Sequence, residues 1–288
     1  MRQSYKGARL LLVHAHPDDE TINNGATMAL YASLGAEVTL VTCTRGEEGE
    51  ILVPGLSHLA STHDDSLGTH REIELKSAMN CLGITDFRFL GGVDKKYRDS
   101  GMMGTPPNDR PDVFWQADLD EASAHLISII EEVKPHVLIT YDEIGGYGHP
   151  DHIQAHRIAM HAAEKSQWKI EKIYWNTIPR SVIADGIEKM REIGSDFFGA
   201  ESADDLPFAK DDEFVTTRID GHAFVDPKMA AMKAHETQIS VDGPFFALSN
   251  NVGLQVWGNE YYTLVEGERQ APLDDKGRES DLFAGIEF

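Results

Sequence analysis

Two short segments of the chain combine imidazoles and carboxylates in a pattern that suits metal chemistry. The first is HAHPDDE at residues 14–20, and the second is HPDH at residues 149–152. Nitrogen and oxygen donors of these types bind Zn²⁺ or Fe²⁺. A catalytic site of this kind takes about three protein ligands and keeps one position open for water. One histidine and one aspartate from the first segment, with one histidine from the second, supply that number.

Spacing alone leaves the choice of ligands in the first segment open. His14 and His16 lie two residues apart, so both could face the same side of an extended strand. Asp18 and Asp19 are adjacent, and only one of them is expected to point at a metal. The other carboxylate would then lie beside the attacking water, which is the place of a general base.

The residues around the second segment suggest further catalytic roles. His149 could protonate a departing amine or stabilise a tetrahedral intermediate, with Asp151 near enough to orient it. Tyr147 stands in a run of glycines, GGYG at residues 145–148, which allows a flexible backbone close to a ligand. Its phenol is therefore expected to swing toward a developing oxyanion.

Strand and helix signals alternate over the first 165 residues, which is typical of a parallel sheet with helices on both faces. In the common doubly wound order the first and fourth strands are neighbours, and the switch point lies between their carboxyl ends. The segment at residues 14–20 follows the first of these strands, and the segment at residues 149–152 follows the fourth. No glycine fingerprint follows the first strand, which argues against a nucleotide-binding domain. The predicted strands are 8–15, 37–44, 87–90, 136–141 and 172–177, and the predicted helices are 20–34, a stripe from 75 to 82, 119–133 and 150–165.

The predicted fold is therefore α/β: a Rossmann-like, doubly wound, mostly parallel sheet with a smaller C-terminal lobe. We expect a core at residues 1–195 and a lobe at residues 196–288 that borders the active-site cleft. Residues 45–68 lack clear periodicity, and loops of that length are usually functional or disordered. Within the lobe we expect a loop at 196–213, strands at 213–219 and 261–265, and a helix at 227–238.

Composition excludes several classes of partner. The 288 residues include 48 acidic and 26 basic side chains, for a net charge of −22. This negative charge repels nucleic acid and anionic membranes, so neither is expected as a partner. Two cysteines are too few for a disulfide framework, and no apolar run is long enough for a signal peptide or a membrane span. We therefore expect a soluble, cytoplasmic protein, with its oligomeric state left open.

Longer stretches around the two segments resemble the PIG-L/LmbE-like deacetylases, zinc-dependent enzymes that hydrolyse N-acetyl groups of glucosaminyl compounds. The stretches are VHAHPDDET, VTCTRGEEGE, YRDSGM, PHVLITYD and GGYGHPDH, and the resemblance covers about residues 8–165. They are similar to the family members that act on N-acetylglucosaminyl-inositol in mycothiol biosynthesis. The resemblance implies hydrolysis of N-acetylglucosaminyl-myo-inositol to glucosaminyl-inositol and acetate, with this small molecule as the partner.

The resemblance also implies a metal centre and a base. The ligands would be His16, Asp19 and His152, holding one Zn²⁺ per chain, with Fe²⁺ as the alternative ion. Asp18 would be the general base that activates the attacking water. The choice that spacing left open in the first segment is thus made by the resemblance.

Five further residues receive implied roles. His149 would be the acid or the oxyanion partner, and Tyr147 a mobile residue that polarises the amide carbonyl. Arg71 and Asp99 would bind sugar or inositol hydroxyls. Glu47, in the long early loop, would line the same cleft.

Two other functions are compatible with the same segments. One is mycothiol S-conjugate amidase, which shares the metal set and cuts a different amide; YRDSGM and the Gly148 that precedes His149 favour the deacetylase. The other is a non-catalytic sugar-binding protein with a structural metal. A structural site is closed by four protein ligands, whereas the pattern supplies three.

Overall fold

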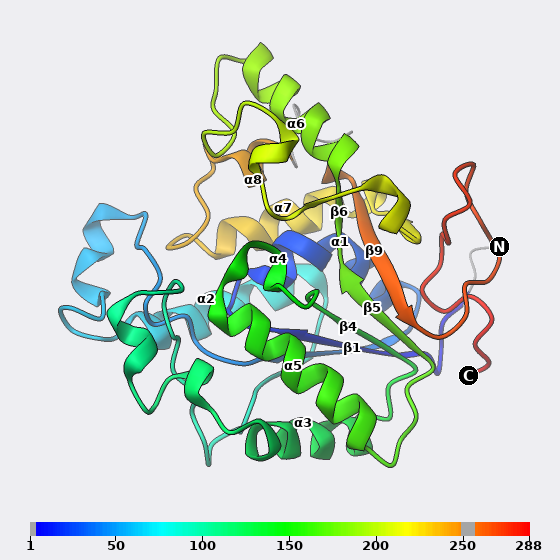
Figure 1. The fold of residues 1–288 in the computed structure, drawn as a ribbon, viewed down its shortest axis with the longest axis horizontal. Helices are drawn as coiled ribbons and strands as arrows, with labels where there is room; N and C mark the ends of the chain where they lie inside the picture. The colour runs from blue at the N-terminus through cyan, green and yellow to red at the C-terminus, as the bar shows by residue number, and fades with distance from the viewer. Residues whose placement is uncertain (1–3, 249–256) are drawn as a thin grey trace.

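A seven-stranded, mostly parallel sheet organises the chain, as seen in a computed structural model that describes residues 4–248 and 257–288 (Figure 1). The strand order is β3-β2-β1-β4-β5-β9-β8, in which β1 to β5 run parallel and β9 and β8 are antiparallel to their neighbours. The predicted α/β fold is confirmed, and β1 and β4 are neighbours as expected. The strands are β1 (Arg9–His14), β2 (Glu37–Thr42), β3 (Asp86–Phe89), β4 (Val137–Thr140), β5 (Lys172–Asn176), β8 (Thr217–Asp220) and β9 (Asn259–Glu266), with β6 (Ile178–Pro179) and β7 (Ala209–Lys210) paired separately.

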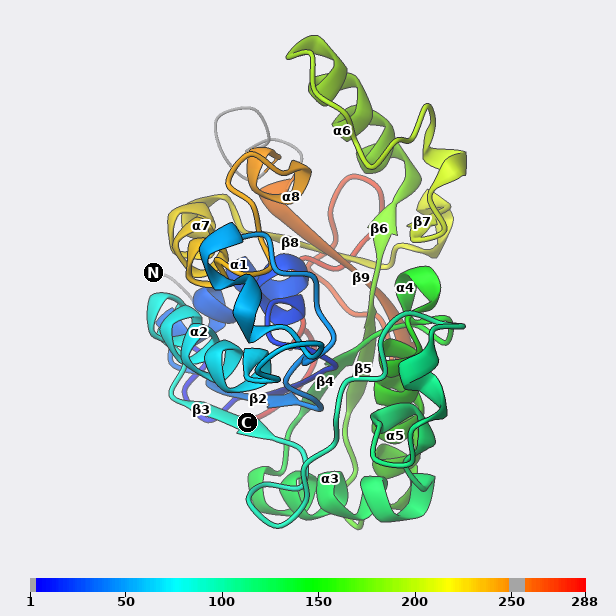
Figure 2. The same cartoon turned by 90° about the vertical axis from the view of Figure 1, so that its left-hand side faces the viewer.

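Helices cover both faces of the sheet (Figure 2). One face carries α1 (Asp19–Ser33), α2 (Leu67–Leu82) and α7 (Val225–Ala234), and the other carries α3 (Leu119–Val133) and α5 (Pro150–Lys165). Within the described ranges, none of the helices is both long and apolar enough to cross a membrane. The other helical elements are α4 (Gly145–Gly148), α6 (Arg180–Glu192), α8 (Pro244–Ala247), and the 3-10 turns η1 (Pro54–Leu59), η2 (Pro106–Asp109), η3 (Phe114–Gln116), η4 (Ala203–Asp205), η5 (Asp212–Phe214) and η6 (His222–Phe224).

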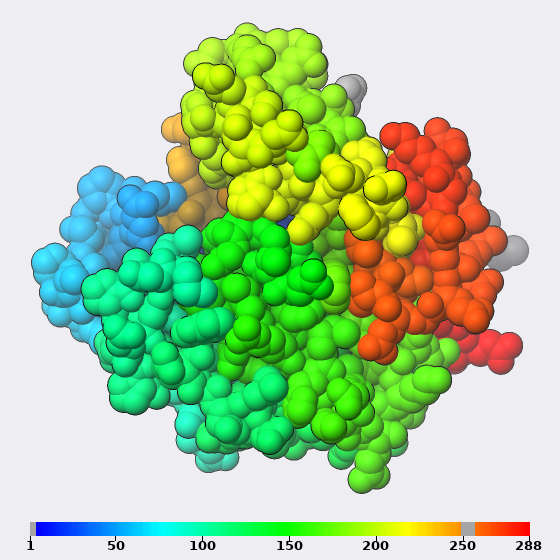
Figure 3. Space-filling view, in the orientation of Figure 1, coloured from blue at the N-terminus to red at the C-terminus, as the bar shows by residue number. Residues whose placement is uncertain are grey.

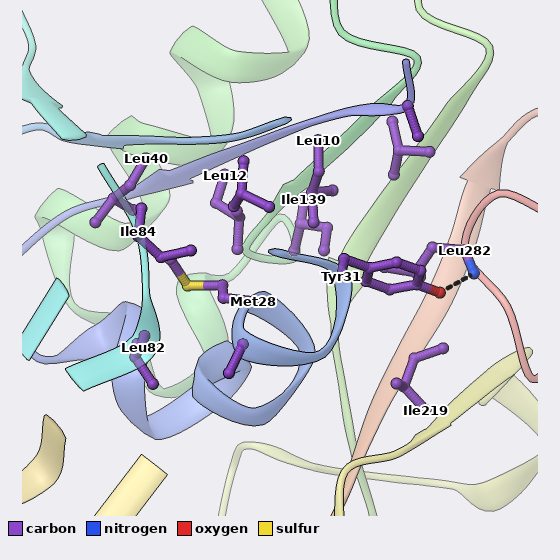
Figure 4. Close-up of a cluster of buried hydrophobic side chains, with 14 of the residues drawn as sticks. Leu10, Leu12, Met28, Tyr31, Leu40, Leu82, Ile84, Ile139, Ile219 and Leu282 are labelled. Atoms are coloured by element: carbon purple, nitrogen blue, oxygen red, sulfur yellow. Dashed lines mark hydrogen bonds between the residues drawn. The ribbon is translucent and has the colours of Figure 1, made fainter. Parts of the chain in front are cut away.

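The strand β1 shows why the central strands form near-continuous apolar runs. Leu10 and Leu12 point into the hydrophobic cluster beneath α1 and α2, where Ile139 of β4 lies beside them (Figure 4). Leu11 and Val13 point into a second cluster beneath α3 and α5. Because both faces of the strand are buried, its four central positions, residues 10–13, are all apolar instead of every second one. This packing fixes β1 and β4, whose carboxyl ends lead into the turns that carry residues 14–20 and 149–152.

The helix α6 had no counterpart in the sequence-based prediction. It buries Ile183, Ile187 and Met190 in a separate cluster outside the main sheet. The spacing of these three residues is that of one helical face, so the signal was present in the sequence.

Two other helices have different ends from those expected. The helix α2 begins at Leu67, about two turns before the predicted stripe, so it places Arg71 near the site. The helix α7 ends at Ala234 and not at residue 238. The residues that follow leave the helix, and the N–H of Thr237 donates to Glu74 Oε1 of α2 at 2.9 Å.

The strands β8 and β9 bring the C-terminal segment into the central sheet. The strand expected at 213–219 begins later, at Thr217, and the one expected at 261–265 lies within β9. The sheet therefore continues across residue 195, and the division into a core and a lobe at that point stays a prediction.

Candidate metal centre and active site

The turn between β1 and α1 carries the first group of site residues. His16 is buried, and its backbone N–H donates to Asp19 Oδ2 at 3.0 Å. Asp18, between them, has a φ of 119°, a positive value that non-glycine residues rarely adopt. Strain of this type costs roughly 1–3 kcal/mol and persists only where the surroundings fix it, often at functional sites. The turn thus holds three polar side chains in a fixed arrangement.

The beginning of α5 faces this turn across the switch point of the sheet. His152 Nε2 lies 3.4 Å from Asp19 Oδ2, and the same oxygen lies 3.4 Å from His16 Nδ1. His152 Nε2 is buried and has no hydrogen-bond partner among residues 4–248 and 257–288. A buried nitrogen without a partner is costly unless a ligand satisfies it. The three side chains predicted as ligands therefore fit a divalent metal ion.

Both imidazoles are held through their second ring nitrogen, as is usual for metal-binding histidines. His16 Nε2 lies 3.1 Å from Asp151 Oδ2, and His152 Nδ1 lies 3.1 Å from the carbonyl oxygen of Gly145. These contacts fix the orientation of each ring. They leave His16 Nδ1 and His152 Nε2 free to face Asp19.

Asp151 has a different neighbour from the one expected. The sequence predicts that its carboxylate orients His149, but the carboxylate contacts His16 and accepts hydrogen bonds from the hydroxyl and the N–H of Ser100. Its link to His149 is through the backbone: the N–H of Asp151 donates to His149 Nδ1 at 3.1 Å. His149 caps the beginning of α5 in this way. The Asp151 carboxylate therefore orients a predicted metal ligand and not His149.

Tyr141, just after β4, belongs to the site although sequence analysis assigned it no role. Its hydroxyl donates to Asp19 Oδ2 at 2.7 Å and accepts the N–H of Ala15 at 2.8 Å. His14 lies behind it, with Nδ1 3.2 Å from the Tyr141 hydroxyl and Nε2 2.7 Å from Asn24 Oδ1. His14 is thus engaged in the layer behind Asp19, whereas His16 faces Asp19. The signal for Tyr141 was its position at the carboxyl end of the fourth strand.

Replacing Tyr141 with phenylalanine is expected to weaken metal binding by about 10- to 100-fold. The variant loses the hydrogen bond that holds Asp19 Oδ2 but keeps the ring, which stacks on His152 with centroids 4.3 Å apart. A titration against a chromophoric chelator measures the affinity. Tyr97→Phe is the matched control, since Tyr97 is also buried and its hydroxyl has no hydrogen-bond partner in the described part of the chain. Equal affinities of the two variants would contradict this role for Tyr141.

His149 and Tyr147 lie beside the two imidazoles. The His149 ring centroid is 4.6 Å from that of His16 and 5.1 Å from that of His152, and the Tyr147 ring is 5.0 Å from that of His152. Burial and the neighbouring imidazoles lower the pKa of His149. Because His149 Nδ1 accepts the N–H of Asp151, the neutral ring carries its proton on Nε2. Nitrogens of His149, His16 and His152 all lie within 4.8 Å of one another, so the three histidines are an alternative ligand set.

Arg71, predicted to bind substrate hydroxyls, is buried beneath the turn after β1. Its guanidinium lies 3.2 Å from Asp18 Oδ2 and also donates to the carbonyl oxygens of Pro17 and Gly46. Burial raises the pKa of Asp18 to about 6, and the nearby Arg71 opposes that rise. Arg71 lies at the cavity wall, so its contact with substrate stays a prediction.

Asp99 lies at the cavity wall, and Glu47 lies one layer behind it. Asp99 Oδ1 is 3.6 Å from His16 Nε2, and Asp99 Oδ2 accepts the N–H of Glu48 at 3.1 Å. Burial alone would raise the pKa of Asp99, but His16 outweighs it and holds the pKa below its usual value. Glu47 accepts the N–H of Asp99 at 3.0 Å, and from this loop only residues 48–50 line the cavity. Glu47 therefore fixes Asp99 and does not line the cleft as expected.

The three predicted ligands and most of the residues around them line one cavity of about 360 Å³, within the size range of small-molecule sites. Part of its wall comes from late segments of the chain. Lys210 of β7 lies 2.8 Å from Asp142 Oδ2, which joins this segment to the α4 turn; the surface view shows the two regions in contact (Figure 3). Several wall residues have no role predicted from the sequence: Asn176, Phe208, Lys210, Gln238 and Phe245.

Known proteins with similar sequences identify the family of this chain. Residues 11–163 match the PIG-L family, described as GlcNAc-PI de-N-acetylase. The chain is 58% identical over 291 residues to the 1D-myo-inositol 2-acetamido-2-deoxy-alpha-D-glucopyranoside deacetylase of Geodermatophilus obscurus. That alignment covers 96% of this chain and 98% of the relative.

Two solved structures share the fold at low sequence identity. The N,N'-diacetylchitobiose deacetylase of Pyrococcus horikoshii superposes with a TM-score of 0.55 at 19% identity, over 90% of this chain and 84% of its own. The 4-carboxy-2-hydroxymuconate hydratase of Pseudomonas putida gives 0.60 at 18% identity, over 93% and 100%. Because a hydratase shares the fold, architecture alone does not define the reaction. The family match and the 58% identity do define the family: the chain belongs to the PIG-L family of de-N-acetylases.

Proposed function

We propose that this protein hydrolyses the N-acetyl group of N-acetylglucosaminyl-myo-inositol, giving glucosaminyl-inositol and acetate, in mycothiol biosynthesis. The observation that carries the reaction type is the arrangement at Asp19, where two imidazole nitrogens lie 3.4 Å from one carboxylate oxygen beside a cavity. The substrate is supported by the 58% identity to a relative named as the deacetylase of this inositol glycoside.

The proposed cofactor is one Zn²⁺ or Fe²⁺ per chain, held by His16, Asp19 and His152. Two imidazole nitrogens and a carboxylate suit either ion. When bound, the metal supplies a Lewis acid for the acetyl carbonyl and for the attacking water. Three protein ligands leave a position open for chemistry, which a structural site with four ligands does not.

Asp18 is proposed to take the proton from the attacking water. Its carboxylate lines the cavity next to Asp19, and Arg71 holds it from behind at 3.2 Å. A pKa of about 6 makes Asp18 a stronger base than an ordinary aspartate, while it is still mostly ionised at neutral pH. The same proton can then pass to the departing amine nitrogen as the C–N bond breaks.

His149 and Tyr147 are proposed to stabilise the developing oxyanion. The neutral His149 ring carries an N–H on Nε2, which supports a role as hydrogen-bond donor over one as acid. Tyr147 is 45% exposed and lies between glycines with positive φ, so its phenol can approach a bound substrate as a second donor.

The remainder of the glucosaminyl-inositol would occupy the rest of the cavity. The Asp99 carboxylate, held there by the N–H groups of Glu48 and Gly101, can accept hydrogen bonds from sugar or inositol hydroxyls, as the family resemblance implies. We place the protein in the cytoplasm, which is supported by two free cysteines, Cys43 and Cys81.

A direct comparison of two amides tests this proposal. Metal-loaded protein is given N-acetylglucosaminyl-inositol in one reaction and a mycothiol S-conjugate in the other, and release of free amine is measured. We expect a higher kcat/KM for the inositol glycoside. Turnover of the conjugate alone would identify the amidase instead. Binding of the glycoside without hydrolysis of either amide would identify a sugar-binding protein.

A further inference from the structure

The strained backbone of Asp18 is held by a residue outside the metal centre. The N–H of Asp18 donates to Glu20 Oε2 at 2.9 Å, and Glu20 is completely buried. The carbonyl oxygen of Asp18 accepts the N–H of Ile22 in the first turn of α1. Because a φ of 119° is unfavourable for aspartate, the conformation depends on acceptors and donors fixed in this way.

Glu20 is fixed in turn by a residue from a distant part of the chain. His235 follows α7 directly, is completely buried, and has its Nε2 3.0 Å from Glu20 Oε1. The hydroxyl of Thr21 donates to the same oxygen at 2.7 Å. Burial alone would lower the pKa of His235, but the Glu20 carboxylate outweighs it and raises the pKa, as expected for an attractive pair.

The segment that carries His235 is itself fixed to α2. The N–H and hydroxyl of Thr237 donate to the two carboxylate oxygens of Glu74 at 2.9 and 2.8 Å. Glu74 is one helical turn from Arg71, which contacts the Asp18 carboxylate. In Figure 2, α7 lies beside α1 and α2. Asp18 is thus held at its carboxylate from α2 and at its N–H from α1, with the end of α7 joined to both.

We propose that His235 is a positioning residue for the hydrolysis, which acts through Glu20 to aim the Asp18 carboxylate. The inference rests on the proposed role of Asp18 as the base. Small misplacements of a reacting group slow a reaction strongly, on the order of 100-fold for 1 Å. Glu20 and His235 are completely buried and do not line the cavity, so neither can touch the substrate. Replacing either one should therefore lower kcat and leave KM and metal content unchanged.

The test compares His235→Leu, which removes the donor, with His235→Gln, whose amide keeps a donor at similar reach. We expect His235→Leu to lower kcat roughly 10- to 100-fold and His235→Gln to restore most of it. His136→Leu is the matched control, because His136 is also a buried histidine, but its ring nitrogens contact Arg9 at the start of β1, away from Glu20. Amide hydrogen exchange at Asp18 provides a readout independent of activity, and it should be faster in His235→Leu only.

A double-mutant cycle with Glu20→Met tests whether the two residues act in series. If His235 acts through Glu20, the double variant loses no more kcat than Glu20→Met alone. Losses that multiply, or a His235→Leu effect confined to KM or metal content, would overturn the proposal. If His235→Leu does not fold, His235→Asn replaces it, since its shorter amide cannot reach Glu20; equal kcat for the Asn and Gln variants would also overturn it. Wild-type protein without turnover would instead refute the proposed function.

Discussion

The Asp18→Asn variant is expected to lose roughly 10²- to 10⁴-fold in kcat and to keep its metal. Asparagine has nearly the same shape but cannot take a proton from the attacking water. Arg71, 3.2 Å from the Asp18 carboxylate, can still donate to the amide oxygen, so the turn should retain its conformation. Steady-state kinetics and elemental analysis on the same preparation measure both quantities.

Glu48→Gln is the matched control for Asp18→Asn. Its carboxylate also lines the cavity, but it is engaged by Arg98 at 2.7 Å and by the Ser61 hydroxyl at 2.7 Å. We therefore expect a much smaller loss of kcat in Glu48→Gln. Loss of metal together with activity in Asp18→Asn would mean that Asp18 is a ligand and not the base.

The His152→Ala variant is expected to lose metal binding and with it at least roughly 10³ in kcat, since Lewis-acid stabilisation contributes several kcal/mol. His152 Nε2 is a buried nitrogen that has no hydrogen-bond partner in the described ranges, and it faces Asp19 at 3.4 Å. Removing it leaves two of three ligands. Equilibrium dialysis followed by metal analysis measures the loss.

His149→Ala distinguishes the two possible ligand sets. If the ligands are His16, Asp19 and His152, the His149 variant keeps its metal and loses roughly 10²- to 10³-fold in kcat as an oxyanion donor. If His149 is a ligand, as the proximity of the three histidines allows, metal affinity falls in that variant as it does in His152→Ala.

The part of the site that could be predicted from sequence depends on local pattern and topology. The apolar runs of β1 and β4 identify buried neighbouring strands, and the turns that follow them must meet at the same edge of the sheet. That reasoning brings His16 and His152 together although they are far apart in the chain. The choice of Asp19 over Asp18 as the ligand came from the family resemblance and not from spacing.

The contacts behind the ligands could not be predicted because they depend on how helices pack on the sheet. Asp151 contacts His16 because of the way α5 is rotated about its axis on the sheet. That rotation is determined by the packing of the whole apolar cluster between α5 and β1. Arg71 lies beneath the turn and not free in the cavity because α2 begins at Leu67, before any clear periodicity. The contact between His235 and Glu20 depends on how α7 packs against α1. The residues that determine this packing are far apart in the chain.

Acetate release measured against added metal tests whether hydrolysis depends on a metal ion held by His16, Asp19 and His152. Metal-free protein is titrated with Zn²⁺ or Fe²⁺ in the presence of N-acetylglucosaminyl-inositol, with His152→Ala in parallel. We expect no release without metal, a rise that saturates at one equivalent per chain, and no such rise in the variant. Full acetate release by the metal-free protein, or an identical titration curve for His152→Ala, would contradict it.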